Sequence, residues 1–342
     1  MPELRFDPIR RRWSIIAPER AFRPKDFAIE KEKINEENNC DFCEGNESKT
    51  PKEVFSIRKE GTPPNSPGWR VRVVPNKYPA LRVEGGLIRK GEGIFDFVSG
   101  IGAHEVIIET PHHKKQLQDM DPKEVVDILK AYKERYIDLA KDMRFRYILV
   151  FKNYGKEAGA SLYHSHSQII ATPIIPIAVS LELEAAKDYY GRKERCIFCD
   201  LIEQELSYNR RIVYKSEKFI VWCPFASSFP FETWIFPLIH RHEFIQMDEE
   251  EINDLSFVLK DVLERIKILL KNPPYNFVIH TAPIPRKRPG RSHYWETLPY
   301  DYHFHIEIIP RITLIAGFEW GSGFYINPVL PEEAARYLRE IK

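Results

Sequence analysis

The sequence predicts an α+β fold made of two similar halves, each an antiparallel sheet crossed by one long helix. Two observations lead to this prediction. A Cys-x-x-Cys pair occurs twice, at Cys40 and Cys43 and again at Cys196 and Cys199, and the same order of elements follows each pair. Each series also ends in a His-x-His strand. Because 342 residues exceed the usual size of one hydrophobic core, we place the two halves at residues 1–172 and 173–342.

The first half is predicted to contain four strands and one long helix. Asp121 can cap a helix that has Pro122 at its first position, and apolar residues at three- and four-residue steps continue it to about Lys141. Runs rich in β-branched and aromatic residues predict the strands. These strands are expected at residues 71–75, 105–110, 147–151 and 164–170.

The second half repeats this order. Three glutamates after Asp248 place negative charge at the positive end of a helix that runs to about Lys271. A further helix is expected in the dividing stretch, at about residues 173–195. The matching strands are expected at residues 219–222, 232–236, 275–279 and 303–309.

Composition excludes several classes of protein. The 51 basic and 50 acidic residues leave a net charge of +1, which excludes binding to nucleic acid or anionic membranes mainly by charge. No apolar run approaches the roughly 18 residues that a membrane span needs. The start of the sequence has no apolar signal region. We therefore expect a cytoplasmic globular protein with no nucleic-acid or membrane partner.

The paired cysteines are interpreted as halves of two zinc sites. Without a secretory signal a disulfide framework is not expected, and thiolates in Cys-x-x-Cys pairs are typical zinc ligands. A thioredoxin-type redox pair needs a strand before it, whereas Cys40 follows a polar stretch. Incidental buried thiols are the alternative for the two pairs, and Cys223 is expected to be a lone packed thiol.

The first His-x-His strand carries the predicted chemistry. Alternate side chains on a strand point the same way, so His164, His166 and Gln168 line one face. The loop at residues 153–161 contains glycines whose backbone N–H groups can approach an anion. Together they predict a phosphate placed against an imidazole. A solvated edge strand with histidines of no function is the alternative.

These residues resemble the galactose-1-phosphate uridylyltransferase family, the doubled branch of the histidine-triad superfamily. The resemblance covers nearly the whole chain. It includes the motif at residues 164–168, both cysteine pairs, and the segments at residues 20–24, 76–81, 153–161 and 317–320. The ADP-glucose phosphorylases, a close relative within that branch, share the paired cysteines and the segment at residues 323–328.

The resemblance implies a double displacement on a nucleotide sugar. His166 would attack the α-phosphorus of UDP-glucose and release glucose 1-phosphate, and galactose 1-phosphate would then take the uridylyl group. Gln168 would donate hydrogen bonds to the phosphoryl oxygens. An ADP-glucose or related nucleotidyl phosphorylase, with the same histidine and phosphate as acceptor, is the second hypothesis. A non-enzymatic zinc adaptor is the third, which the near-zero net charge disfavours.

The resemblance also implies the substrate-binding residues. The nucleotide would be bound near the start of the chain and in two loops, and the leaving phosphate by the glycine-containing loop. The hexose would be bound near the end of the chain, with the partner subunit of a homodimer contributing. The implied residues are Arg20, Arg23, Asn76, Tyr78 and Asn153 for the nucleotide, Gly159 and Ser161 for the phosphate, and Phe318 and Glu319 for the hexose.

Two structural metal sites are implied in the same way, with zinc at both and iron possible at the second. The ligand sets are Cys40, Cys43, His113 and His164 in the first half, and Cys196, Cys199, His240 and His303 in the second. One form of the family binds its second metal through a carboxylate and three histidines. The matching residues here are Glu182, His280, His305 and Glu307, and the last is not a histidine, which favours the Cys/His set.

The second His-x-His strand differs from the first at one position. Glu307 stands where the first strand has Gln168. A carboxylate repels a phosphate, so we predict that the second half has lost the transfer chemistry and keeps only a metal site.

Overall fold

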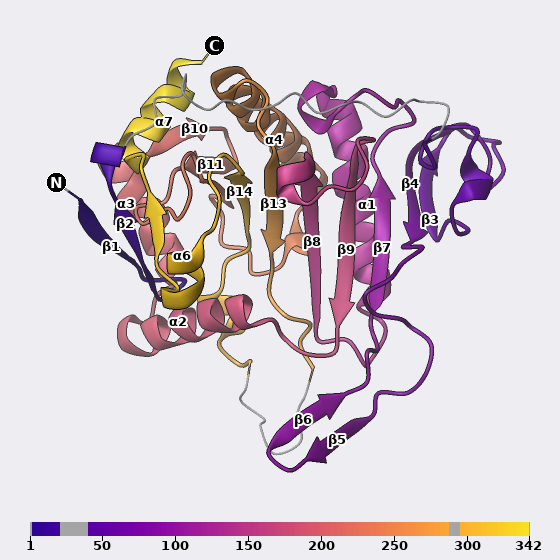
Figure 1. Ribbon diagram of the computed structural model, residues 1–342, viewed down its shortest axis with the longest axis horizontal. Coiled ribbons are helices and arrows are strands. Elements are labelled where there is room, and N and C mark those ends of the chain that lie inside the picture. The colour runs from indigo at the N-terminus through magenta and orange to yellow at the C-terminus, as the bar shows by residue number, and fades with distance from the viewer. Residues whose placement is uncertain (1, 21–39, 287–294, 342) are drawn as a thin grey trace.

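The computed structural model describes residues 2–20, 40–286 and 295–341. One antiparallel sheet of ten strands runs through both halves (Figure 1). The strands of the first half are β3 (Phe55–Arg58), β4 (Trp69–Pro75), β7 (Ala103–Ile108), β8 (Tyr147–Tyr154) and β9 (His166–Thr172). Those of the second half are β10 (Ile212–Lys215), β11 (Phe219–Trp222), β12 (Thr233–Pro237), β13 (Tyr275–His280) and β14 (His305–Pro310).

The duplication is visible in the strand order. From edge to centre the first half runs β3-β4-β7-β9-β8 and the second half runs β10-β11-β12-β14-β13. The halves join where β8 pairs with β13, with Tyr154 opposite Tyr275 and Val150 opposite Ile279. The predicted fold class is confirmed. The structure adds that the halves share one sheet, because each inner strand satisfies the unpaired backbone groups of the other.

Two long helices cover one face of this sheet. They are α1 (Pro122–Leu139) and α4 (Glu249–Leu270), which end within two residues of the predicted positions. Asp248 accepts a hydrogen bond from the backbone N–H of Glu251 at 2.8 Å, as expected of an N-cap. Buried side chains such as Leu129 and Leu259 form the main core between the helices and the sheet.

The opposite face of the sheet differs between the halves. In the second half it is covered by α2 (Ile177–Lys193) and α3 (Ile197–Tyr208), which bury an aromatic cluster. In the first half the core cluster on this face is small, and Phe42 of the first Cys-x-x-Cys segment packs against it. Among the described residues, the first half therefore has far less covering the face that carries His166.

The remaining elements lie at the edges of the molecule. A three-stranded sheet is formed by β1 (Glu3–Asp7), β2 (Arg12–Ile16) and β15 (Tyr325–Asn327), and the hairpin of β5 (Arg89–Glu92) and β6 (Phe95–Val98) extends away from the body (Figure 1). The other helices are α5 (Leu298–Asp301), α6 (Gly317–Ser322) and α7 (Pro331–Glu340). None of the helices in the described ranges is long and apolar enough to span a bilayer.

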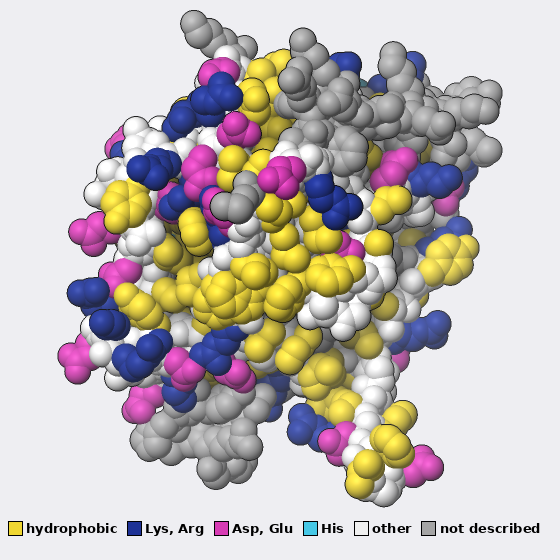
Figure 2. All heavy atoms as spheres, turned by 60° about the vertical axis from the view of Figure 1, so that its left-hand side comes forward, with side chains coloured by type: hydrophobic (Ala, Val, Ile, Leu, Met, Phe, Trp, Pro, Cys, Tyr) yellow, Lys and Arg dark blue, Asp and Glu magenta, His cyan; other side chains and the backbone are white. Residues whose placement is uncertain are grey.

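Apolar side chains gather on the side of β1 and α6. Figure 2 turns this side forward and shows a broad apolar area in its middle. Exposed apolar residues of β1, β2 and α6 include Leu4, Phe6, Trp13, Phe318 and Trp320.

Candidate active site

The first Cys/His set comes together as predicted. The ligand atoms of Cys40, Cys43, His113 and His164 all lie within 4.8 Å of one another. The Sγ atoms of Cys40 and Cys43 each lie 3.6 Å from Nδ1 of His164, close to the roughly 3.5 Å that separates sulfur and nitrogen ligands across a tetrahedral zinc ion. Nε2 of His164 donates to the carbonyl of Thr110 at 2.7 Å, which leaves Nδ1 free to bind the ion.

This set suits a metal that has a structural role. Burial lowers the pKa of His164 to about 4, so the ring is neutral, as a metal ligand must be. Four protein ligands fill a tetrahedral shell and leave no position for substrate. The donor chemistry is compatible with zinc.

The second set assembles in the same way. The ligand atoms of Cys196, Cys199, His240 and His303 lie within 4.8 Å of one another. Sγ of Cys199 is 3.3 Å from Nδ1 of His240 and 3.7 Å from Nδ1 of His303. Nε2 of His240 donates to the carbonyl of Pro299 at 3.0 Å, just as Nε2 of His164 donates to the carbonyl of Thr110. The duplication therefore extends to both potential metal centres.

The two potential metal centres predict the metal content of the protein. Cys196→Ser should lower bound metal from two ions per chain to one, because one thiolate is lost from a closed shell. The melting temperature should fall by about 5 °C or more. Elemental analysis and calorimetry measure both quantities. Cys223→Ser is the matched control, since Cys223 is fully buried outside the clusters and should leave the metal content unchanged. Unchanged metal content in Cys196→Ser would contradict the assignment.

His166 lies beside the first set without joining it. Its side chain is 7% exposed, and its ring lies edge-on to Phe42 at 5.4 Å between centroids. Nδ1 of His166 donates to the carbonyl of His164 at 2.8 Å. A carbonyl can only accept, so the proton sits on Nδ1 and Nε2 keeps its lone pair. Burial holds the pKa of His166 below its ordinary value, which keeps the ring neutral and nucleophilic.

Gln168 and Asn76 are linked through a histidine that the sequence analysis did not single out. Nε2 of His104 lies 2.7 Å from Oε1 of Gln168 and 3.0 Å from Nδ2 of Asn76. His104 and Asn76 also line a cavity of about 680 Å³ beside the loop at residues 76–81. Asn76, predicted to bind the nucleotide, and Gln168, predicted to bind the phosphoryl group, thus belong to one cluster. Alternation along β7 could have pointed to His104, because His104, Val106 and Ile108 share the face of His166.

The glycine-containing loop follows β8. A Cβ atom built on Gly159 would lie 3.8 Å from Nδ2 of Asn153, so the loop approaches that side chain closely. Gly155 and Gly159 have positive φ angles of 81° and 89°, which other residues rarely adopt. Asn276 of the second half donates to Oδ1 of Asn153 at 2.8 Å, so β13 helps to fix this side of the site.

A buried ion pair lies behind His166, on the helix face of the sheet. Nζ of Lys152 donates to Oε2 of Glu109 at 2.6 Å, to Oγ of Ser165 at 3.0 Å and to the carbonyl of His166 at 3.0 Å. Burial alone would raise the pKa of Glu109, but the charge of Lys152 holds it below its usual value. Tyr132 of α1 completes the network by donating to Glu109. This network ties β7, β8 and β9 together behind His166.

The second half has a different arrangement at the matching place. His305 is fully buried and stacks on Phe236, with ring centroids 4.8 Å apart and an angle of 12°. Nε of Arg10, from the turn between β1 and β2, donates to Oε1 of Glu307 at 3.0 Å. Its guanidinium also lies over Trp234 at 4.5 Å. An aromatic ring and an arginine therefore occupy the space beside His305 and Glu307, which supports the predicted loss of transfer chemistry there.

The carboxylate and histidine set is present in addition to the Cys/His set. Ligand atoms of Glu182, His280, His305 and Glu307 lie within 4.8 Å of one another. Nδ1 of His280 is 2.9 Å from Glu182. Burial alone would lower the pKa of His280, but Glu182 and Glu307 hold it above its ordinary value. Arg10 pairs with Glu307 of this cluster and also with Glu232 at 2.7 Å.

Some predicted substrate residues lie away from His166 within one chain. Phe318 and Glu319 sit on α6, which Figure 1 shows on the other side of the molecule from β9. Glu319 accepts a hydrogen bond from the backbone of Ala316 at 3.0 Å. Arg20 lies exposed in a short 3-10 turn, and Ser161 and Tyr78 are exposed within the loops at residues 153–161 and 76–81. Arg23 lies outside the described residues.

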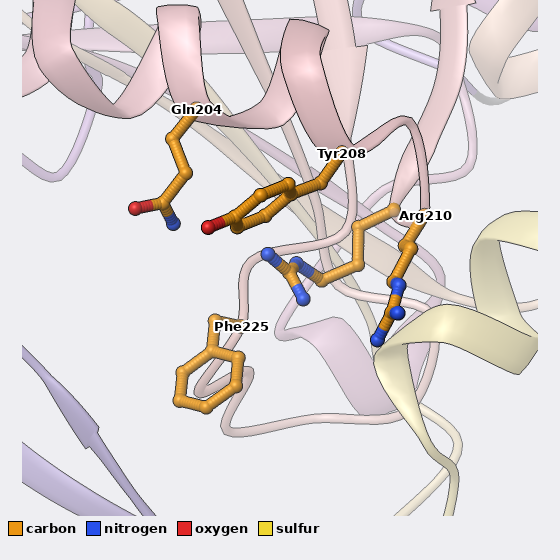
Figure 3. Close-up of a pocket in the computed structure, with 5 residues that line it drawn as sticks. Gln204, Tyr208, Arg210 and Phe225 are labelled. Atoms are coloured by element: carbon orange, nitrogen blue, oxygen red, sulfur yellow. The ribbon is translucent and has the colours of Figure 1, made fainter.

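A second hollow lies at the end of α3. It has a volume of about 550 Å³ and is lined by Gln204, Tyr208, Arg210, Arg211 and Phe225 (Figure 3). Arg211 is already paired with Glu205 at 2.6 Å and with Glu332 at 2.9 Å. None of the predicted catalytic or metal residues lines it.

Comparison with known proteins agrees with this geometry. Residues 1–176 match the N-terminal domain of galactose-1-phosphate uridyl transferase, and residues 182–342 match its C-terminal domain. The chain belongs to this family. It is therefore a nucleotidyltransferase, and the resemblance seen in the sequence is confirmed.

Individual members of the family cover the full chain. ADP-glucose phosphorylase of Arabidopsis thaliana is 39% identical over 347 residues, covering 99% of this chain and 93% of that protein. Galactose-1-phosphate uridylyltransferase of Thermotoga maritima is 30% identical over 348 residues, covering 99% and 98%. A crystal structure of the Arabidopsis phosphorylase with bound ADP-glucose superimposes with a TM-score of 0.82 at 36% identity, covering all of both chains.

Proposed function

We propose that this family member transfers a nucleotidyl group from a nucleotide sugar through a covalent intermediate on His166. The observation that carries the proposal is the contrast between two neighbouring histidines. His164 turns Nδ1 into the Cys/His set, whereas His166 holds its proton on Nδ1 and presents an unprotonated Nε2. A neutral imidazole fixed in this way is a competent nucleophile toward phosphorus.

In the first step Nε2 of His166 attacks the α-phosphorus of the nucleotide sugar. A phosphorus–nitrogen bond forms while the bond from that phosphorus to the bridging oxygen breaks. The bridging oxygen keeps the electron pair of the broken bond and leaves as part of the sugar 1-phosphate. In the second step a phosphate oxygen of the acceptor attacks the same phosphorus, and the electron pair of the phosphorus–nitrogen bond returns to Nε2.

Neighbouring groups have separate roles in this scheme. Gln168 donates to the phosphoryl oxygens, where charge shifts during the transfer. The backbone at Gly159 and the hydroxyl of Ser161 hold the leaving phosphate, while Asn76, Tyr78 and Asn153 contact the nucleoside. We assign Arg20 and Arg23 to nucleotide binding on the resemblance alone. Each Cys/His set would hold one structural zinc ion, and its four ligands would fix the strand or segment that carries them.

The donor and acceptor define two candidate reactions. The first is uridylyl transfer from UDP-glucose to galactose 1-phosphate, in galactose metabolism, supported by the family match over both halves. The second is phosphorolysis of ADP-glucose, with phosphate as acceptor. Two observations favour this second reaction. The chain is 39% identical to such an enzyme, against 30% to the Thermotoga uridylyltransferase. The motif also has Ser165 and Ser167 instead of the proline and glycine expected of a uridylyltransferase.

A second copy of this chain would complete the site in a cytoplasmic homodimer. Phe318 and Glu319 lie away from His166 within one chain, on the side where apolar residues are exposed (Figure 2). A partner's α6 segment would supply the hexose contacts. Sedimentation of the purified protein should give the mass of a dimer, twice 40.3 kDa. A monomer with full activity would contradict this part of the proposal.

A labelling experiment decides between the candidate reactions. The protein is incubated with UDP-glucose or ADP-glucose labelled at the α-phosphate, and acid-labile label on the protein is measured. Label from UDP-glucose that galactose 1-phosphate removes supports the first reaction. Label from ADP-glucose that inorganic phosphate removes supports the second. If neither donor labels the protein with both metals bound, the covalent mechanism is wrong.

A further inference from the structure

His104 joins two parts of the proposed site through both of its ring nitrogens. The backbone N–H of Ala80 donates to Nδ1 at 3.1 Å, and Nε2 lies 2.7 Å from Oε1 of Gln168. The backbone N–H of Asn76 also donates to the carbonyl of His104 at 2.8 Å. His104 is half-buried on β7, and its closest polar contacts are the loop at residues 76–80 and Gln168.

The partners of His104 determine where its proton lies. A backbone N–H can only donate, so Nδ1 must be the acceptor and carries no hydrogen. A neutral ring with a bare Nδ1 carries its proton on Nε2. Nε2 therefore donates to Gln168. Nδ2 of Asn76 lies 3.0 Å from the same nitrogen but is itself a donor, because Oδ1 of Asn76 accepts from the backbone of Tyr78 at 2.8 Å.

This donor fixes which end of the Gln168 amide faces the substrate. With Oε1 held by His104, the NH₂ group is the end that remains for the phosphoryl oxygens. If the amide rotated by half a turn, NH₂ would face the N–H of His104 and two donors would meet. Loss of the hydrogen bond from Nε2 of His104 to Oε1 disfavours the rotated form. Gln168 alone could present either end, and only its NH₂ can stabilise negative oxygens.

We propose that His104 is a positioning residue that orients the Gln168 amide for phosphoryl transfer. Because the backbone N–H of Ala80 can only donate to Nδ1, the neutral imidazole donates from Nε2, and the Gln168 amide accepts through Oε1. His104 thereby also couples the nucleoside-binding loop at residues 76–80 to the group that contacts the phosphate. The proposal rests on the nucleotidyl transfer proposed above, and it adds a residue for which the sequence motif gives no role.

A double-mutant cycle tests whether His104 acts through Gln168. His104→Phe keeps a ring of similar size and removes both polar contacts. It should lower the rate of nucleotidyl-enzyme formation by about 10- to 100-fold. In a Gln168→Ala background the same change should alter the rate by less than about threefold, because the group to be oriented is gone. If His104→Phe lowers the rate by the same factor with and without Gln168, the two residues act independently and the proposal is overturned.

Two further variants separate positioning from a loss of structure. His104→Gln can still donate to Oε1 of Gln168 and should recover most of the lost rate. His242→Phe makes the same substitution at a half-buried histidine of the second half and should leave the rate unchanged. A His104→Gln variant as slow as His104→Phe would contradict the role of the donor.

Nitrogen NMR of the protein labelled at histidine tests the orientation without any substrate. The His104 signals are identified by their absence in His104→Phe. We expect the tautomer with the proton on Nε2, and an Nδ1–H or doubly protonated ring at pH 7.5 would overturn the proposal. Because this spectrum needs no turnover, it decides the role of His104 even if neither donor labels His166. Failure of the proposed function and failure of this inference are therefore distinguishable.

Discussion

His166→Asn should abolish the covalent labelling of the protein by a nucleotide sugar. Asparagine keeps a polar side chain of similar reach but has no nucleophilic nitrogen, so the first step has no attacking atom. The overall transfer rate should fall by at least about 10⁴-fold. Labelling with acid quenching and a steady-state assay of the transfer measure the two effects. Labelled protein at the wild-type level would show that another residue is the nucleophile.

The second half supplies the matched control for this variant. His305 occupies the position in β14 that His166 occupies in β9, but it is fully buried against Phe236. His305→Asn should label to the wild-type extent, with a lower melting temperature because a packed ring is lost. Loss of labelling in folded, metal-loaded His305→Asn would show that the second half shares in the chemistry.

Lys152→Met should destabilise the protein by about 3–5 kcal/mol, because it leaves Glu109 buried without its counter-ion. Both side chains of this pair are almost fully buried. Equilibrium unfolding in urea measures the change. The destabilisation should reach the strand that carries His166, since Lys152 also donates to the carbonyl of His166 and to Oγ of Ser165.

The double variant Glu109→Gln, Lys152→Met is the control for the buried charge. It removes both charges at once, so it should recover a large part of the stability that Lys152→Met loses. A single variant as stable as the wild type would show that the pair is not a structural support. A double variant less stable than the single one would show that packing, and not charge, dominates at this position.

The fold and the two cysteine pairs could be predicted because they depend on local, repeated patterns. The caps at Asp121 and Asp248 define the starts of the two long helices, and strand alternation places His164 and His166 on one face. Spacing alone paired Cys40 with Cys43 and Cys196 with Cys199. The family resemblance supplied His113 and His164, and the duplication carried that set over to His240 and His303. The structure brings both ligand sets together.

The remaining features depend on contacts between distant residues, which no local pattern encodes. Arg10 meets Glu307 across 297 positions of the chain, and Lys152 meets Glu109 across 43. The sequence analysis treated the carboxylate and histidine set as an alternative to the Cys/His set, whereas both are assembled side by side. His104 belongs to no motif. Strand alternation places it on the face of His166, but its contact with Gln168 at 2.7 Å is known only from the structure.

Mass spectrometry of the trapped intermediate tests the central claim most directly. The protein is mixed with UDP-glucose or ADP-glucose and quenched under conditions that preserve phosphorus–nitrogen bonds. It is then digested, and the modified peptide is sequenced. We predict one nucleoside monophosphate per chain, carried by His166. An adduct on any other residue, or turnover in which no adduct ever forms, would contradict a covalent transfer through this histidine.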